Sequence, residues 1–316
     1  MGVLKICGIG NGLRPGARGC MCVLLLLCFT GGLHAGGTLD ADRRRHKLSV
    51  TGRGGIATML YRPENGSYRV GGGGGVGLTY AFYFLPYMGV GSGLEFSFLR
   101  SSYRTAARDY TQNAYDGDPM FGGEGEPFCF RVEMSGEHTV QQAAYLYVPL
   151  MLRFRVRWFS FGIGAKAGLP ISGRYDRYMG TLKTSGLYAR FPEAFENIPE
   201  HGFVDKRAAY GGGRLELRTD WSLSVDFGIT WRPEGRGKGK GGRVPFMDVG
   251  VFADWGLRNL HRAADKGEVS AYPVTYDTEV YGCLRHHDGL TGASGRPAAL
   301  RSLAVGVRVA VGLSWQ

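Results

Sequence analysis

The chain has 316 residues, a formal net charge of +11 at pH 7, 53 glycines and 12% aromatic residues. That length suits one large or two ordinary domains. The glycines follow no collagen-like triplet period, and no long Ser-, Pro- or Gln-rich tract is present, which excludes fibrous and disordered classes.

The first 35 residues have the pattern of a secretory signal peptide. The basic residues Lys5, Arg14 and Arg18 precede the apolar run CMCVLLLLCF at 20–29, and no acidic residue accompanies them. The run is shorter than the roughly 20 residues that a membrane-spanning helix needs. We therefore expect a signal peptide over 1–35. A lipoprotein modified at Cys28 and a cytoplasmic protein with an apolar N-terminus are the alternatives.

The glycine-rich segment that follows alternates with a period of two residues. In RVGGGGGVGLTYAFYF (69–84), Val76, Leu78, Tyr80 and Phe82 share one face, and small or polar residues occupy the other. Period two is typical of a β-strand. A formal dinucleotide-binding pattern, Gly72-x-Gly74-x-x-Gly77, lacks the following helix that would bind phosphate, so we expect no nucleotide site.

Further segments along the chain alternate in the same way. In the last of them Val305, Val307, Val309 and Val311 lie on one face, with Arg308 and small residues on the other. The complete set of predicted strands is 47–61, 68–84, 88–103, 145–157, 159–175, 215–231, 247–260 and 301–315.

The connections between these segments alternate in length. The short set is 85–87, 157–158 and 232–243, and the other set is 62–67, 104–144, 176–214 and 261–300. An even number of long alternating strands with short turns at one rim and long loops at the other is typical of a transmembrane β-barrel. Closure gives every backbone group a partner in lipid. We therefore predict an all-β, antiparallel, up-and-down transmembrane β-barrel of eight strands.

Two alternatives to this architecture remain. A soluble barrel would show the same alternation with the apolar face turned inward. The segment VSAYPVTYDTEVY (269–281) could add a hairpin and give ten strands.

Aromatic residues cluster near both ends of the predicted strands, which favours the membrane barrel, because two aromatic belts mark two membrane interfaces. The short-turn set is Phe82, Phe84, Tyr87, Trp158, Phe159, Trp231, Phe246 and Trp315, and the long-loop set is Tyr61, Tyr68, Tyr103, Tyr145 and Tyr175.

Residues 47–316 resemble the small eight-stranded outer-membrane barrels of diderm bacteria, of the OmpW, OmpX and OmpA-barrel kind. YLYVPLMLRFR (145–155) is similar to a proline-containing strand of such barrels, DVGVFADWGLRNL (248–260) resembles their penultimate strand, and LAVGVRVAVGLSW (303–315) their C-terminal assembly signal. The resemblance implies residence in the bacterial outer membrane, contact with its lipid, and insertion by the barrel-assembly machinery. It implies a periplasmic segment over 36–46, a barrel domain over 47–316, and a monomer.

The sequence patterns that mark catalytic, metal or nucleic-acid sites in other proteins do not indicate an enzyme here. The basic run at 232–243 lacks interleaved aromatic residues, so we expect a solvated turn and no nucleic-acid partner. His261, Cys283, His286, His287 and Asp288 lack the spacing of a zinc site. Neither a nucleophile elbow nor an HExxH pattern is present. We expect no catalytic site, no cofactor and no metal.

Charged residues on the predicted inner face are nearly balanced in sign. Because eight strands enclose a space that side chains just fill, and buried unpaired charge is costly, we expect a paired network that plugs the interior. Its candidate members are Arg53, Arg69, Glu95, Arg153, Arg155, Lys166, Glu216, Arg218, Asp220, Asp226, Asp248, Asp254 and Arg308.

Two cysteines lie beyond the predicted signal peptide. Cys129 and Cys283 fall in long loops on the same side of the predicted barrel. They form a candidate disulfide in an oxidising compartment, and two free thiols are the equal alternative.

Two functions fit these features. The first is a non-enzymatic outer-membrane protein whose long surface loops bind extracellular or host ligands. The second is a narrow channel for small solutes of the OmpW type.

Overall fold

The computed structural model describes residues 44–61, 66–117, 125–232, 242–262, 273–277, 282–287 and 299–316. The predicted signal peptide lies outside these residues. The described chain belongs to the compact unit Ala41–Gln316 and is almost entirely antiparallel β-sheet.

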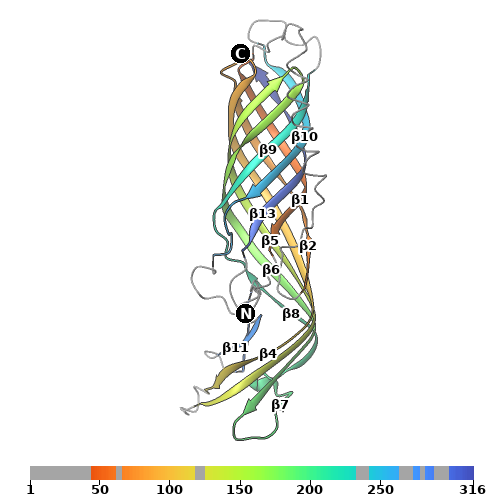
Figure 1. The fold of residues 1–316 in the computed structure, drawn as a ribbon, viewed down its shortest axis with the longest axis vertical. Coiled ribbons are helices and arrows are strands. Elements are labelled where there is room, and N and C mark those ends of the chain that lie inside the picture. Colours follow the sequence, from red (N-terminus) through yellow and green to blue (C-terminus); the bar gives the residue numbers. More distant parts are fainter. Residues whose placement is uncertain are drawn as a thin grey trace, which may run out of the picture. The chain divides into compact units, whose positions relative to one another are not determined.

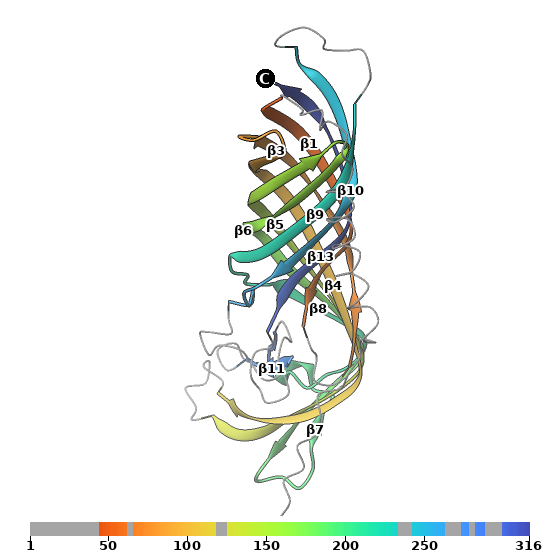
Figure 2. The same ribbon diagram turned by 45° about the horizontal axis from the view of Figure 1, so that its top comes forward.

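Eight strands of this unit form a closed ring, which is compatible with a β-barrel (Figures 1 and 2). Each strand pairs with two neighbours, and β1 closes the ring against β13 from His46↔Trp315 to Leu60↔Arg301. In ring order the strands are β1 (His46–Leu60), β3 (Gly72–Phe82), β4 (Met88–Asp116), β5 (Glu126–Val156), β6 (Phe159–Tyr188), β9 (Asp220–Trp231), β10 (Val244–Gly256) and β13 (Arg301–Trp315).

The eight predicted strands correspond to these eight ring strands, but three of them are much longer than predicted. β4 and β5 stay paired from Met88↔Phe154 to Asp116↔Glu126, and β6 follows β5 as far as Tyr188. Most of the segments predicted as loops over 104–144 and 176–214 is therefore sheet. We call this continuation, together with the short β7 (Phe195–Glu196) and β8 (Asp205–Arg214) that pair with β6, the extension.

The remaining elements are small. β2 (Ser67–Val70) pairs with β4 outside the ring path, and a short 3-10 helix covers Pro199–His201. β11 (Val274–Tyr276) and β12 (Leu284–His286) form a separate two-stranded sheet, which we call the hairpin. The predicted hairpin near 269–281 is thus partly real, but it does not join the ring, so ten ring strands is wrong for the described chain.

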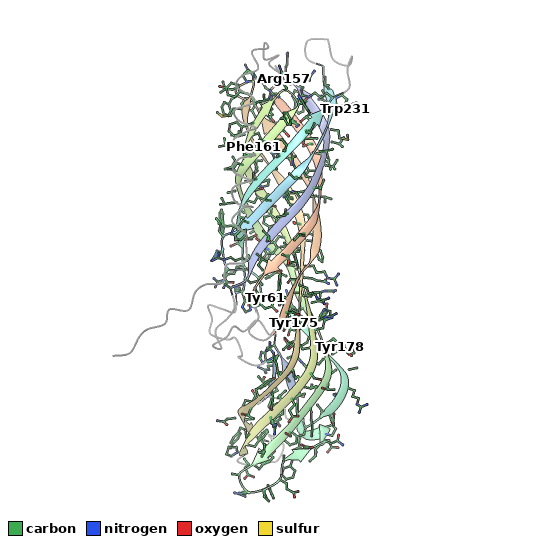
Figure 3. The ribbon with its side chains drawn as sticks, turned by 45° about the vertical axis from the view of Figure 1, so that its right-hand side comes forward. Tyr61, Arg157, Phe161, Tyr175, Tyr178 and Trp231 are labelled. Atoms are coloured by element: carbon green, nitrogen blue, oxygen red, sulfur yellow. The ribbon has the colours of Figure 1, made fainter. Side chains whose placement is uncertain are left out.

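The connections at one end of the ring are tight. Arg157 takes the left-handed conformation, with a φ of 54°, in the two-residue turn between β5 and β6. Such turns match the twist of the strands they join. Figure 3 shows Arg157 and Trp231 at this short-turn end, and Tyr61 and Tyr175 where the ring meets the extension.

Candidate functional site: the interior of the ring and its closed end

The interior of the ring is charged, and its charges are arranged in pairs. Arg53 Nη1 lies 2.6 Å from Glu95 Oε1 and 2.8 Å from Asp254 Oδ2. Lys166 Nζ lies 2.9 Å from Glu95 Oε2 and 2.9 Å from Asp254 Oδ2. Two cations and two carboxylates thus form one closed cluster from four different strands. Ser224 adds a hydrogen bond to Asp254.

A second cluster lies nearer the short-turn end. Arg153 Nη1 donates to Asp226 at 2.8 Å, and Arg308 Nη2 lies 3.0 Å from Asp226 and 3.1 Å from Asp248. Lys47 Nζ lies 3.2 Å from Asp248. Lys47 was not among the predicted members, although it has the same strand parity as Arg53 and alternation alone could have found it.

Glycines and an aromatic ring accommodate the large charged side chains. A Cβ on Gly162 would lie 2.8 Å from Arg153 Nη1, and one on Gly168 would lie 2.4 Å from the Tyr147 ring. The Arg53 guanidinium stacks 3.6 Å from the centre of the Phe252 ring. Space for these side chains therefore comes from β6.

Asp220 differs from the other carboxylates because its hydrogen bonds come from hydroxyl groups. Tyr147 donates to its Oδ2 at 2.7 Å and Ser302 at 2.5 Å. Asp220 is fully buried and links the charged clusters to the apolar end of the ring.

Besides Asp220, four of the predicted members lie outside these clusters. Arg155 is buried at the short-turn end, where it donates to the carbonyl oxygens of Pro86 and Arg44 and stacks on Tyr83. Arg218 is half-buried ahead of β9.

The placement of Arg69 and Glu216 inside the ring was wrong, since both are exposed. The alternation breaks before β9 begins at Asp220, so Leu215 and Leu217 turn inward and Glu216 turns outward. Arg69 belongs to β2, which lies off the ring path.

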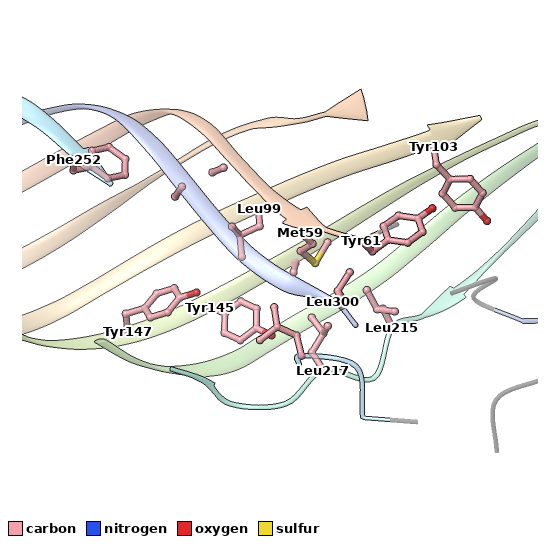
Figure 4. Close-up of a cluster of buried hydrophobic side chains, with 14 residues drawn as sticks. Met59, Tyr61, Leu99, Tyr103, Tyr145, Tyr147, Leu215, Leu217, Phe252 and Leu300 are labelled. Carbon is pink, nitrogen blue, oxygen red and sulfur yellow. The ribbon is translucent and has the colours of Figure 1, made fainter. Parts of the chain in front are cut away.

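An apolar cluster closes the ring where it meets the extension (Figure 4). We call it the seal. It is formed by residues of which none exceeds 8% exposure, namely Met59, Tyr61, Leu99, Tyr103, Tyr145, Leu215, Leu217, Leu260 and Leu300. Five tyrosines were predicted to form an outward belt at this end; Tyr61, Tyr103, Tyr145 and Tyr175 are instead buried inside, and Tyr68 is partly buried against the seal.

The space left inside the ring is small. A cavity of about 50 Å³ lies among the charged clusters, lined by residues such as Arg53, Glu95, Arg153, Asp226 and Asp248. It has room for a few water molecules. The described interior is thus filled by charged side chains and ends at an apolar seal.

Beyond the seal, a buried polar cluster joins the ring to the extension. Glu137 accepts a hydrogen bond from Tyr103 Oη at 2.9 Å and lies 3.1 Å from Arg177 Nε and 3.4 Å from Arg108 Nε. Burial acts to lower the pKa of Arg177, but Tyr103 and Glu137 outweigh it and raise the pKa. Strand alternation did not predict this cluster, because Arg108, Glu137 and Arg177 lie in segments predicted as loops.

The hairpin packs on the apolar face of the extension. Arg177 Nη1 donates to the Pro273 carbonyl at 2.9 Å, and Tyr110 both donates to Val274 O and accepts from Val274 N. Burial raises the pKa of Tyr110. The apolar core beneath the hairpin is Phe128, Phe130, Val132, Met134, Met179, Leu182, Phe203, Val204, Ala209, Val274 and Tyr276.

The outer face changes character between the ring and the extension. On β5 the ring exposes Val148, Leu150 and Leu152, with Leu150 67% exposed. On the same strand the extension exposes Arg131 and Glu133, which form an ion pair at 3.0 Å. A single strand thus turns apolar side chains outward in one part and charged side chains outward in the other.

The two cysteines are free thiols. Cys129 lies between Phe128 and Phe130, whose buried rings lie 5.2 Å and 5.5 Å from that of Tyr276 in the hairpin. Strand alternation turns Cys129 to the opposite face of the sheet from the hairpin that carries Cys283. The candidate disulfide is therefore absent from this structure.

Within the described residues, no group of three or more His, Cys, Asp or Glu side chains has the arrangement of a metal site. The same part of the chain holds no helix long and apolar enough to cross a membrane. The sequence matches no protein-family model and no curated protein.

Proposed function

We propose that the protein is an integral outer-membrane β-barrel whose closed ring anchors the extension outside the membrane, where the extension binds extracellular or host ligands. The change in the outer face along β5 carries this proposal. An outward apolar face suits hydrocarbon, and an outward charged face suits water.

The backbone of the ring agrees with a membrane environment. A closed antiparallel sheet leaves no strand edge unpaired, which is what a spanning sheet requires in lipid. Apolar side chains from every ring strand are exposed, among them Val50, Leu78, Leu94, Leu150, Ile163, Leu223, Val251 and Val307. A soluble protein of this size would expose such a continuous apolar surface at the cost of aggregation.

The interior supports an anchor better than a channel. The two charged clusters and the seal occupy the interior of the ring, and the cavity among the charged clusters has a volume of only about 50 Å³. The extension, by contrast, presents exposed apolar side chains to its surroundings, including Tyr115, Phe191 and Tyr210. Exposed apolar groups of this kind are common in binding surfaces.

The test is reconstitution of the mature protein into planar bilayers and vesicles. We expect stable insertion, protease cleavage confined to the extension side, and no resolvable single-channel steps. Discrete conductance steps from the unmodified protein would contradict the anchor function and favour the solute channel. Failure to insert, with the protein remaining monomeric in aqueous buffer, would refute the barrel in the membrane altogether.

A further inference from the structure

We propose that six arginines on the outer face of the sheet, at the level where the ring meets the extension, bind the phosphate groups of anionic membrane lipids. We call this set the arginine belt, and its members are Arg69, Arg100, Arg104, Arg174, Arg214 and Arg301. The inference rests on the proposed membrane location and adds to it a lipid-binding surface.

The position of the belt follows from strand alternation. Arg100 follows Leu99, Arg104 follows Tyr103 and Arg301 follows Leu300, and each of these three apolar neighbours is a buried residue of the seal. Adjacent residues of a strand point to opposite faces. These three arginines therefore lie outside the seal, and all six belt arginines are exposed.

Four neighbouring strands bring several belt members into one row. The register pairs Arg100 with Gln142, Gln142 with Arg174, and Arg174 with Arg214. Neighbouring strands lie about 4.8 Å apart. The Arg174 Nε atom also donates to Gln142 Oε1 at 3.2 Å, which fixes Arg174 within the row.

A second row lies beside the first. Arg104 pairs with His138 across β4 and β5, and Arg69 pairs with Ser102. Partial burial, together with the positive charges of Arg104, Arg69 and Arg100, lowers the pKa of His138. The positive charges of all three arginines therefore act on the same histidine side chain.

Such crowding of like charges on a sheet is unfavourable without an anionic partner. Acidic neighbours offset it only in part: Asp176 lies 3.7 Å from Arg174 with both side chains largely exposed, and Glu216 is exposed close to Arg214 in the sequence. Arginine matches phosphate with its planar set of donors.

The apolar residues beside the belt identify a lipid as the source of the phosphate. Phe96 and Phe98 share the outer face of β4 with Arg100, and Val305 shares that of β13 with Arg301. A ligand lying here meets apolar side chains on one side and guanidinium groups on the other. An anionic lipid matches this arrangement, because its phosphate headgroup lies next to apolar acyl chains.

The test uses two tryptophans that lie near Arg301, the belt member on β13. Trp221 and Trp255 are about half exposed on the outer face, and the Leu257 amide donates to the Trp221 carbonyl, which brings the two strand ends together. In the reporter protein Trp158, Trp231 and Trp315 are changed to Phe. It is reconstituted into phosphatidylcholine vesicles that contain brominated phosphatidylglycerol or brominated phosphatidylcholine, whose bromine atoms quench nearby tryptophan fluorescence.

We expect brominated phosphatidylglycerol to quench the reporter more strongly than brominated phosphatidylcholine at equal content. The variant Arg174→Gln/Arg214→Gln/Arg301→Gln should lose this preference by at least about fivefold, the factor expected for one lost arginine–phosphate interaction at a membrane surface. The matched control Arg190→Gln/Lys206→Gln/Arg207→Gln removes the same charge from exposed positions of the extension and should retain the preference.

Each other outcome overturns a defined part of the argument. Equal quenching by both brominated lipids would refute the lipid-binding belt while leaving the membrane barrel intact. No quenching by either lipid would refute the membrane location itself. Loss of the preference on addition of inorganic phosphate, but not of chloride at equal ionic strength, would assign the belt to a free anion. Tight binding of soluble heparin without a lipid preference would assign it to an acidic polymer.

Discussion

The ring and the extension share three strands, β4, β5 and β6, yet they are organised in opposite ways. In the ring, charged side chains such as Lys166 and Asp226 are buried and leucines face outward. In the extension, Phe128, Phe130 and Met134 are buried and charged residues face outward. Strand geometry is common to both, so the difference lies in what surrounds each part.

The two regions also differ in what stabilises them. The extension gains from removing apolar area from water, as an ordinary soluble domain does. The ring gains little in that way if lipid surrounds it, and its interior depends on complete pairing of charges in a space with little water. The seal and the Glu137 cluster lie at the boundary between the ring, which has a charged interior, and the extension, which has an apolar core.

The largest effect is expected from unbalancing the ring interior. Lys166→Met removes the ammonium group that contacts Glu95 and Asp254 and leaves two carboxylates with Arg53. Removing one partner of a buried ion pair costs about 3–5 kcal/mol. The free energy of unfolding, measured by urea titration in vesicles with tryptophan fluorescence, should fall by that amount.

The double variant Lys166→Met/Glu95→Gln is the control for this prediction. It removes one charge of each sign, and we expect it to recover part of the stability lost in Lys166→Met. An unchanged stability in the single variant would mean that the clusters are solvated, and the ring would then be an open pore.

A core substitution in the extension should act on that region alone. Phe130 is fully buried among Phe128, Phe203 and Tyr276, and Phe130→Ala leaves a cavity that costs about 3 kcal/mol or more. We expect faster amide hydrogen exchange over 128–134 and 273–277, with unchanged exchange in β9 and β10. Equal loss of protection in both regions would show that the ring and the extension unfold as one unit.

A charge placed on the outer face distinguishes the surroundings of the two regions. Val225 is exposed on the ring, and Val225→Arg should cost about 2–4 kcal/mol if it faces the middle of a bilayer. Asn113→Arg adds the same charge to the exposed outer face of the extension, opposite Cys129, and should change stability by less than about 0.5 kcal/mol. Heat-modifiable gel mobility after vesicle insertion reports folding of both, and equal, small effects would contradict a lipid-facing ring.

The ring was predictable from the sequence because one physical rule governs it throughout. Side chains such as Val305, Val307 and Arg308 alternate without interruption along β13, so strand position and facing follow directly. The rule failed at Leu215 and Glu216, where the chain leaves regular pairing before β9 and the parity changes.

The alternation of side chains could not predict the extension or the seal. Residues 104–144 contain a break in parity at Gly136, where φ is 62°, so the buried positions switch from even to odd numbers. An aromatic residue near a strand end, such as Tyr103, fits an outward belt or an inward seal equally well by type. Only the three-dimensional closure of the ring by Leu217, Leu260 and Leu300 decides between them.

The smallest expected effect is a pH dependence of the hairpin, which tests whether the extension behaves as a water-exposed domain. Burial, and then the charges of Arg177, His287 and Lys206, lower the pKa of His286 from 6.5. The unfolded hairpin therefore takes up a proton at a higher pH than the docked one. Docking is fully stable above about pH 6.5 and weakens as the pH falls below it.

Hydrogen exchange of residues 274–276 should accordingly accelerate between about pH 7 and about pH 5, after correction for the intrinsic pH dependence of exchange. His286→Gln should remove most of this acceleration, because the glutamine does not titrate. His287→Gln is the matched control: His287 bonds to Thr275 at the edge of the hairpin, and its loss should leave the pH response in place. If His287→Gln removed the pH response and His286→Gln did not, the titrating group would be His287 at the outer edge of the hairpin and not His286 on its buried face.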